Sequence, residues 1–224
     1  MLFWIAAGAG VAVAYLLGAT PSGYLAGRLL KGIDIRAHGS GSTGATNVLR
    51  TLGKGPAAVV IVADLLKGAA AIVFVRWFFP WLYAWPSLAA GAPDLQAWEA
   101  WGVCLAGLAV VLGHSRSIWL GFTGGKSAAT GLGVLLALAW PVGLGAAAAV
   151  IVVLALWRIM SLGSMLGAAT AIVLICVLPQ PAAYRLLVIA GSLYVIVRHR
   201  ANIRRLLAGV EPRIGQASPQ PAGD

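Results

Sequence analysis

Two polar segments of this 224-residue chain contain most of the side chains that could perform chemistry. The first, GSGSTGATNVLR at residues 39–50, combines glycines with hydroxyl and amide side chains and ends in an arginine. Glycine permits the positive φ angles that let successive N–H groups point at one anion, and arginine adds a bidentate charged donor. Phosphate binding explains this composition better than a flexible linker with a helix cap. The candidate residues are Ser40, Gly41, Ser42, Gly44, Asn47 and Arg50.

The second segment, GFTGGKSAAT at residues 121–130, resembles a nucleotide phosphate loop but lacks its spacing. A Walker A motif needs a glycine five residues before Gly125, where this chain has Leu120, so ATP hydrolysis is excluded. We expect Gly124 and Gly125 to expose N–H groups at the start of a helix, whose dipole favours an anion. Lys126 adds a full charge, although a lysine extending to a membrane boundary would also explain it. Ser127 and Thr130 complete this candidate set.

His114 is a candidate general base or phosphate donor, with a hydrogen-bonding role at a helix end as the alternative. None of the three histidines is followed by an aspartate five residues later, so the His-x4-Asp dyad of many acyltransferases is missing. The sequence contains no zinc motif and no nucleophile elbow. Two later polar segments, 158–164 and 198–211, add the candidates Ser161, Asn202, Arg205 and Glu211.

The segments that must position these residues are apolar. With 60% hydrophobic and 10% charged residues, the chain is typical of an all-α polytopic membrane protein. Several apolar stretches are shorter than the roughly 20 residues of a perpendicular span. The pair around Pro141 is the weakest, so five spans with a re-entrant or interfacial pair is the alternative to seven. The seven expected segments are about 2–20, 56–79, 98–113, 127–140, 142–157, 162–178 and 182–197.

Basic residues orient the predicted bundle. With the N-terminus outside, 13 of the 16 lysines and arginines fall in or beside inward loops, which the positive-inside rule favours. The opposite loops hold Asp94, Glu99 and the aromatic stretch FFPWLYAWP. The C-terminus is therefore expected inside, and the four polar segments all lie on the cytoplasmic face. The exceptions are Lys67, Arg76 and Arg185.

The remaining features point to packing within one domain. Residues 1–211 are expected to form a single membrane-integral domain, and 212–224 a disordered cytoplasmic tail. Asp64 and Lys67 share a helical face inside an apolar segment, where they are expected to pair or to line a wet cavity. The two cysteines, both in apolar segments, suggest core packing. The net charge of +10 follows the membrane topology, so nucleic-acid binding is not expected.

Taken together, the polar segments resemble the bacterial acyl-phosphate:glycerol-3-phosphate acyltransferase family. The family's first motif, S-G-N-x-G-A-T-N-x-x-R, matches 40–50, and its second, G-H followed by F-x-G-G-K-G-V-A-T, matches 113–130. The S-L-x-S loop matches 161–164, and N-I-x-R-L-x-x-G-x-E matches 202–211. Two departures are Ser42 for the usual Asn and Ser127 for the usual Gly. Both keep a small donor, which predicts altered affinity rather than lost function.

The resemblance implies transfer of a fatty acyl group from acyl phosphate to glycerol 3-phosphate at the cytoplasmic face of the bacterial inner membrane. The products are 1-acyl-glycerol 3-phosphate and phosphate, with no cofactor or metal. The implied catalytic residues are Lys126, Ser40, Arg50 and His114, the other candidates binding substrate. A soluble enzyme that makes acyl phosphate is a possible partner. The rival interpretations are a transporter for a phosphorylated metabolite, which lacks an internal repeat here, and a noncatalytic scaffold, which leaves the glycine-lysine loop unexplained.

Overall fold

The computed structural model describes residues 1–89 and 92–216 and is built from helices. Residues 217–224 of the expected tail lie outside this description. Two 3-10 turns, Ile35–Ala37 and Ile118–Leu120, lie in the polar segments. The α-helices are α1 (Leu2–Ala19), α2 (Ser22–Lys31), α3 (Ala45–Leu52), α4 (Lys54–Tyr83), α5 (Pro86–Ala89), α6 (Leu95–Ser115), α7 (Ala128–Leu138), α8 (Trp140–Trp157), α9 (Met160–Val177), α10 (Ala182–Arg198) and α11 (Arg200–Leu207).

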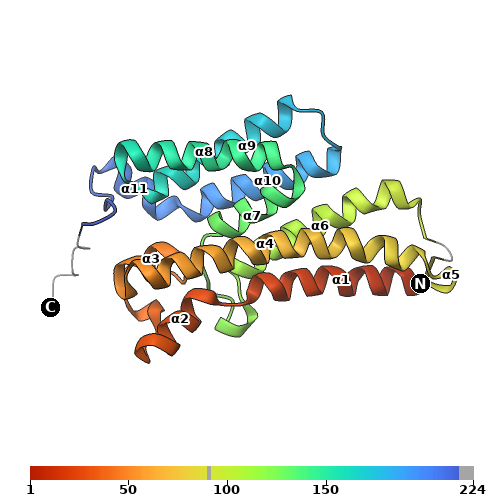
Figure 1. Ribbon diagram of the computed structural model, residues 1–224, viewed down its shortest axis with the longest axis horizontal. Helices are drawn as coiled ribbons and strands as arrows, with labels where there is room; N and C mark the ends of the chain where they lie inside the picture. The colour runs from red at the N-terminus through yellow and green to blue at the C-terminus, as the bar shows by residue number, and fades with distance from the viewer. Residues whose placement is uncertain (90–91, 217–224) are drawn as a thin grey trace.

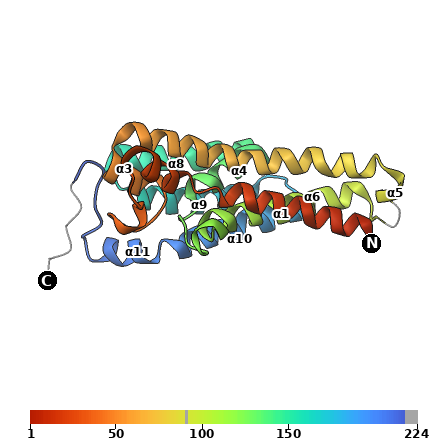
Figure 2. The same cartoon turned by 90° about the horizontal axis from the view of Figure 1, so that it is seen from below.

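The long helices form two layers, with α1, α4 and α6 in one and α8, α9 and α10 in the other (Figure 1). The short helix α7 lies between the layers and packs against both α4 and α8. The amphipathic helices α2, α3 and α11 gather at one end, and α5 and the N-terminus lie at the other (Figure 2). One end of the bundle is therefore built from the polar segments, and the other from the aromatic stretch at residues 78–86.

Glycines let neighbouring helices approach one another at backbone distance. A Cβ on Gly68 of α4 would collide with the carbonyl of Thr130, and one on Gly133 of α7 would collide with that of Leu65. Gly167 of α9 faces Ala146 and its neighbour Val150 in the same way. This close packing suits helices in lipid, where van der Waals contact replaces the hydrophobic driving force.

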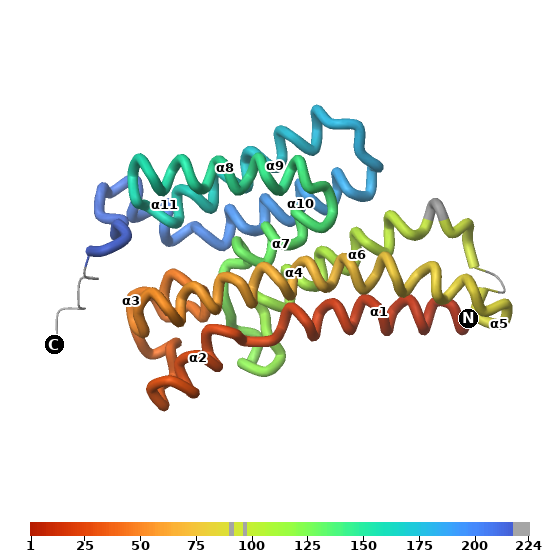
Figure 3. The backbone as a smooth tube through the Cα atoms, in the orientation of Figure 1, coloured from red at the N-terminus to blue at the C-terminus, as the bar shows by residue number. Residues whose placement is uncertain are grey.

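The expected apolar segments all coincide with helices, but one of them is shorter than a perpendicular span requires. Helix α7 has 11 residues, or about 16 Å at 1.5 Å per residue, against a hydrocarbon core of about 30 Å. By length and composition, Leu2–Lys31, α4, α8 and α9 can each cross a membrane, and α10 with α11 forms a fifth candidate bent by 57°. The tube in Figure 3 shows α7 and α8 as consecutive arms of one hairpin.

The interior charges are paired, as the sequence predicted. The Nζ of Lys67 lies 2.9 Å from Oδ1 of Asp64 and also donates to the carbonyl of Thr20. The hydroxyl of Ser22 donates to the same Asp64 oxygen at 2.6 Å. These contacts join the break between α1 and α2 to the middle of α4, so a buried charge pair fixes the entry to the first polar loop.

Candidate functional site

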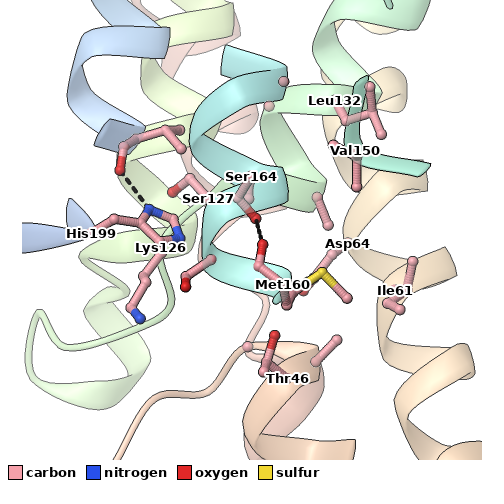
Figure 4. A pocket seen from close by; sticks show the side chains of 18 of the residues that line it. Thr46, Ile61, Asp64, Lys126, Ser127, Leu132, Val150, Met160, Ser164 and His199 are labelled. Carbon is pink, nitrogen blue, oxygen red and sulfur yellow. Dashed lines mark hydrogen bonds between the residues drawn. The ribbon is translucent and has the colours of Figure 1, made fainter. Parts of the chain in front are cut away.

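A cavity of about 750 Å³ opens at the end of the bundle where the polar segments meet. Side chains from α3, α4, α6, α7, α8, α9, α10 and α11 line it, together with the loops before α3 and α7 (Figure 4). Its mouth carries basic residues and its interior is mostly apolar. The basic residues are Arg50, Lys54, Lys126, Arg158, Arg205 and Arg213, whereas the acidic ones, Asp64 and Glu211, are engaged in hydrogen bonds within the protein.

Asn47 organises the first loop from inside. Its side-chain amide donates toward the carbonyls of Ile35, His38 and Ser42, at 2.8 to 3.0 Å, and its Oδ1 accepts from the backbone N–H of Ser40 at 2.9 Å. The residue is buried. Both polar groups of Asn47 are thus occupied within the protein, where they hold the loop in shape, and the residue also lines the cavity.

Arg50 lies on α3 and lines the cavity. Its guanidinium is half-buried, and among the contacts of the described residues it has no hydrogen bond or ion pair. Burial lowers the pKa of this group, with Glu211 opposing and Arg205 adding to the shift. A desolvated arginine facing a cavity without a carboxylate partner is suited to an anionic ligand.

Lys126 is held by the opposite side of the site. Its Nζ donates to Oδ1 of Asn202 at 2.5 Å, and the Asn202 amide donates to Oε1 of Glu211. The Ser161 hydroxyl donates to Oε1 of Glu211 at 2.6 Å, and Arg205 Nε donates to Oε2 at 2.7 Å. Glu211 thus connects the segment after α11 to α9 and fixes the residue that positions Lys126.

Burial is the main reason why the pKa of Lys126 falls to about 8, and the charges of Arg205, Arg50 and Arg198 lower it further. An anion entering the cavity would raise it again by supplying an opposite charge. Burial raises the pKa of Glu211, but hydrogen bonds from Ser161, Asn202 and Arg205 outweigh this effect and leave it below its ordinary value. Glu211 is therefore a carboxylate at neutral pH.

The paired glycines Gly124 and Gly125 pack closely against the end of α6. The N–H of Gly125 donates to the carbonyl of His114, and a Cβ on Gly125 would collide with the His114 ring. A Cβ on Gly124 would collide with the same carbonyl. The glycines let the loop pack against the end of α6, and they place Lys126 at the cavity without lining it themselves.

Ser127 and Thr130 are both fully buried. Ser127 takes a left-handed conformation, with φ 63°, and its hydroxyl donates to the carbonyl of Val111 at 2.7 Å. The small side chain therefore anchors the turn into α7 to α6. Thr130 is not among the lining residues, and its backbone carbonyl lies where α7 packs against Gly68 of α4.

His114 has an acidic neighbour that the sequence did not reveal. Its Nδ1 lies 3.5 Å from Oδ1 of Asp64, and both residues line the cavity. The two come from α6 and α4, so a search for an aspartate close in sequence cannot find this pair. His199, from the turn between α10 and α11, was also missed; it lines the cavity with Nδ1 2.7 Å from the carbonyl of Val195 (Figure 4).

The structure brings most of the candidate residues together, and it leaves four outside the lining. The four are Gly41, Gly124, Gly125 and Thr130. Among the residues that the structure describes, no three His, Cys, Asp or Glu side chains gather as a metal site would require. The candidates that line the cavity are Ser40, Ser42, Gly44, Asn47, Arg50, His114, Lys126, Ser127, Ser161, Asn202, Arg205 and Glu211.

Comparisons with known proteins agree over nearly the whole chain. The family model described as glycerol-3-phosphate acyltransferase matches residues 9–209. Glycerol-3-phosphate acyltransferase 2 of Rhizobium johnstonii is 66% identical over 222 residues, which cover 97% of this chain and 100% of the relative. The glycerol-3-phosphate acyltransferase of Trichormus variabilis is 56% identical over 217 residues, 96% of each chain.

Solved structures show the same fold. The crystal structure of PlsY (YgiH), an integral membrane glycerol 3-phosphate acyltransferase, in its glycerol 3-phosphate form matches with a TM-score of 0.79 and 35% identity. The match covers 93% of this chain and 96% of that chain. The lysophosphatidic acid form matches with a TM-score of 0.77 and 34% identity, over 95% and 97% of the two chains.

Proposed function

Because the chain belongs to the glycerol-3-phosphate acyltransferase family, we propose that it transfers a fatty acyl group from acyl phosphate to glycerol 3-phosphate. The products are 1-acyl-glycerol 3-phosphate and inorganic phosphate. The observation that carries the proposal is one cavity with a cationic mouth and an apolar interior. Both substrates bring phosphate to the mouth, and the donor also brings an alkyl chain for the interior.

Arg50 and Lys126 are the proposed phosphate ligands. Arg50 has no hydrogen-bond or ion-pair partner among the residues that the structure describes, and Lys126 is desolvated and directed by Asn202 into the same cavity. Arg205 adds charge while holding Glu211, and the hydroxyls of Ser40 and Ser42 add neutral donors beside Arg50. A charge-assisted hydrogen bond is roughly twice as strong as a neutral one, so the two unshared cations dominate recognition.

The reaction needs charge neutralisation and positioning more than a strong base. The glycerol hydroxyl oxygen attacks the acyl carbon, the bond from that carbon to the phosphate oxygen breaks, and phosphate leaves. The hydroxyl proton passes to a phosphate oxygen of the substrate. Lys126 stabilises the negative charge that develops on the leaving phosphate. His114 and Asp64 border this region and hold its wall in place.

The choice of acyl phosphate over a thioester is supported by what lines the cavity. Among the described lining residues none is Phe, Tyr or Trp, so an adenine base would find no large aromatic side chain to stack on. The mouth instead collects isolated cations, suited to bare phosphate groups. A soluble enzyme that makes acyl phosphate would deliver this labile donor at the same face.

The orientation follows from the charges. The cavity mouth and the basic loops share one end of the bundle, which we place on the cytoplasmic side of the bacterial inner membrane. The N-terminus is then outside and the C-terminus inside. Both seven spans and five spans with α7 and α8 as a re-entrant pair satisfy this arrangement, because α7 begins and α8 ends at the cavity mouth.

A direct assay separates the alternatives. Protein purified in detergent and reconstituted in lipid discs is given glycerol 3-phosphate with palmitoyl phosphate, palmitoyl-CoA or palmitoyl carrier protein, each with a chelator present. Lysophosphatidic acid and phosphate are expected with palmitoyl phosphate alone. Comparable rates with either thioester would refute the donor assignment. Uptake of glycerol 3-phosphate into vesicles without acylation would favour the transporter.

A further inference from the structure

We propose that the closed end of the cavity measures the acyl chain, with Ala146, Leu135 and Leu187 as the residues that set its longest accepted length. We further infer that Arg76 is a positioning residue for this end. The inference rests on the proposed function, since it places the acyl chain of the donor in the apolar part of the cavity. It concerns which chains are accepted, rather than whether acyl transfer occurs.

The interior of the cavity is an apolar column. Below the basic mouth its walls are formed by α7, α8, α9 and α10, with Ile61 and Leu65 from α4 and Val111 from α6. Ser192 is the polar exception on α10. In Figure 4, Leu132 and Val150 lie along this column, away from Lys126. The larger apolar lining side chains of these helices include Leu135 of α7, Leu154 of α8 and Leu187 of α10.

The column has a measurable depth. On α8 the lining runs from Arg158, at the mouth, to Ala146, and on α10 it runs from His199 to Leu187. Each stretch covers twelve residue-to-residue steps, which corresponds to about 18 Å of helix. Because the two helices give the same depth, the column ends at one level. Its depth is comparable with the length of an extended fatty acyl chain.

Below that level the helices pack without space. One turn beyond Ala146, Val142 is fully buried, and one turn beyond Leu187, Ala183 is 2% exposed. A Cβ on Gly107 of α6 would meet the Leu187 side chain, so α6 and α10 touch there. The floor of the cavity is therefore a packed layer of side chains, and a longer acyl chain could bind only by displacing that layer.

Arg76 fixes the part of the floor that comes from α7. This helix ends at Leu138, and the N–H of the next residue, Ala139, bonds the carbonyl of Leu135, so the carbonyls of Ala137 and Leu138 need other donors. The Arg76 guanidinium donates to the carbonyls of Ala137 and Leu138 at 2.7 and 3.0 Å and to the Tyr184 hydroxyl at 3.3 Å. Leu135 lies within one turn of these carbonyls. Arg76 therefore determines the depth at which the Leu135 side chain lies in the cavity.

The expected selectivity follows from methylene burial. Each methylene group that moves from water into an apolar site strengthens binding by about fourfold. A methylene group that meets a packed floor brings no such increase and strains the surrounding side chains. A larger side chain at the floor should therefore shorten the preferred chain. A smaller one should lengthen it.

The experiment compares floor variants with matched lipid-facing controls. Wild type, Ala146→Leu and Leu187→Ala are given an equimolar mixture of dodecanoyl, tetradecanoyl, hexadecanoyl and octadecanoyl phosphate, and the lysophosphatidic acids are resolved by mass spectrometry. The controls are Ala148→Leu and Leu186→Ala, at exposed positions of the same two helices. Ala146→Leu should reduce the longest product at least about tenfold relative to the shortest, and Leu187→Ala should shift the profile toward longer chains.

Two outcomes separate failure of the inference from failure of the proposed function. If wild-type protein makes no lysophosphatidic acid from any acyl phosphate, the donor assignment is wrong. If it does so and the Ala146→Leu and Leu187→Ala profiles equal those of their controls, the chain is measured elsewhere and the inference is overturned. A loss of total activity in a floor variant does not bear on the ratio, which is an internal comparison within one mixture.

Arg76→Met tests the positioning role. It should broaden the chain-length profile toward longer products, Arg76→Lys should restore part of the selectivity, and Arg185→Met, at an exposed position of α10, should leave the profile unchanged. A wild-type profile in folded Arg76→Met would remove Arg76 from the proposal. If Arg76→Met does not purify in folded form, the profile of Arg76→Lys decides this role.

Discussion

The Nζ of Lys126 and Oδ1 of Asn202 are 2.5 Å apart, although 76 residues separate them in the sequence. This contact joins the loop before α7 to α11, and Glu211 holds Asn202 from the other side. The lysine is thus directed into the cavity by an amide, which leaves its charge available. A carboxylate in the same place would neutralise that charge before substrate arrived.

The lowered pKa of Lys126 predicts a pH dependence of phosphate binding. Because this pKa is about 8, the lysine of the free enzyme loses its proton as pH rises through that value. We expect kcat/KM for glycerol 3-phosphate to fall above pH 8, since kcat/KM reports the free enzyme. In Lys126→Arg, which stays charged, the falling limb should move to higher pH even if the maximum rate is lower. An unshifted limb in that variant would assign the titration to another group.

Removing the unpaired cation at Arg50 should affect turnover strongly. A lost charge-assisted contact to the reacting phosphate corresponds to about 2–4 kcal/mol of transition-state stabilisation, or roughly 30- to 1000-fold in kcat/KM. Arg50→Ala should show this loss with normal insertion and purification. Arg204→Ala is the matched control, because Arg204 is exposed and does not line the cavity. Near-normal turnover in Arg50→Ala would restrict that residue to a structural role.

Glu211 should stabilise the folded state more at neutral pH than at acidic pH. Its pKa is lowered in the folded state, so its contribution is fully present above its ordinary pKa of 4.5 and is lost as pH falls through the lower folded value. Glu211→Gln should therefore lower the thermal midpoint at neutral pH by an amount corresponding to about 1–3 kcal/mol. The gap to wild type should narrow in acid. Thermal unfolding followed by tryptophan fluorescence measures both, and a gap independent of pH would contradict the assignment.

Gly125→Ala distinguishes packing from phosphate recognition. The added methyl would collide with the His114 ring, so the loop must move and the folded yield or thermal midpoint should fall. Gly55→Ala is the control, because a methyl there meets nothing within 4 Å. If Gly125→Ala instead keeps its stability and only raises KM for glycerol 3-phosphate, the glycine does contact the ligand.

Accessibility labelling tests the orientation. Single cysteines at Ser87, an exposed residue of α5, and at Ser218, in the C-terminal tail, are introduced after replacing Cys104 and Cys176. A membrane-impermeant maleimide on intact cells should label the first, and the second only after permeabilisation. Labelling of both from the same side would mean an even number of spans.

The helices could be predicted from sequence because a bilayer demands long apolar segments, and the polar segments could be placed because charge marks the loops between them. The direct roles were harder to predict. Asn47 is of a residue type that often binds ligands, but the partners of its side-chain amide depend on how the backbone folds between Ile35 and Ser42. The pairing of Asp64 with His114 depends on α4 lying beside α6, which no local spacing records.

The short length of α7 also constrains how the protein is made. A helix of about 16 Å offers the translocation machinery too little apolar length to be released into lipid as an independent span. Its capping arginine belongs to α4, which is synthesised earlier, and its partner α8 is synthesised later. The depth of α7 therefore depends on its contacts with α4 and α8 and not on its own length. The cavity has all its walls only when α8, α9 and α10 are packed around this short helix.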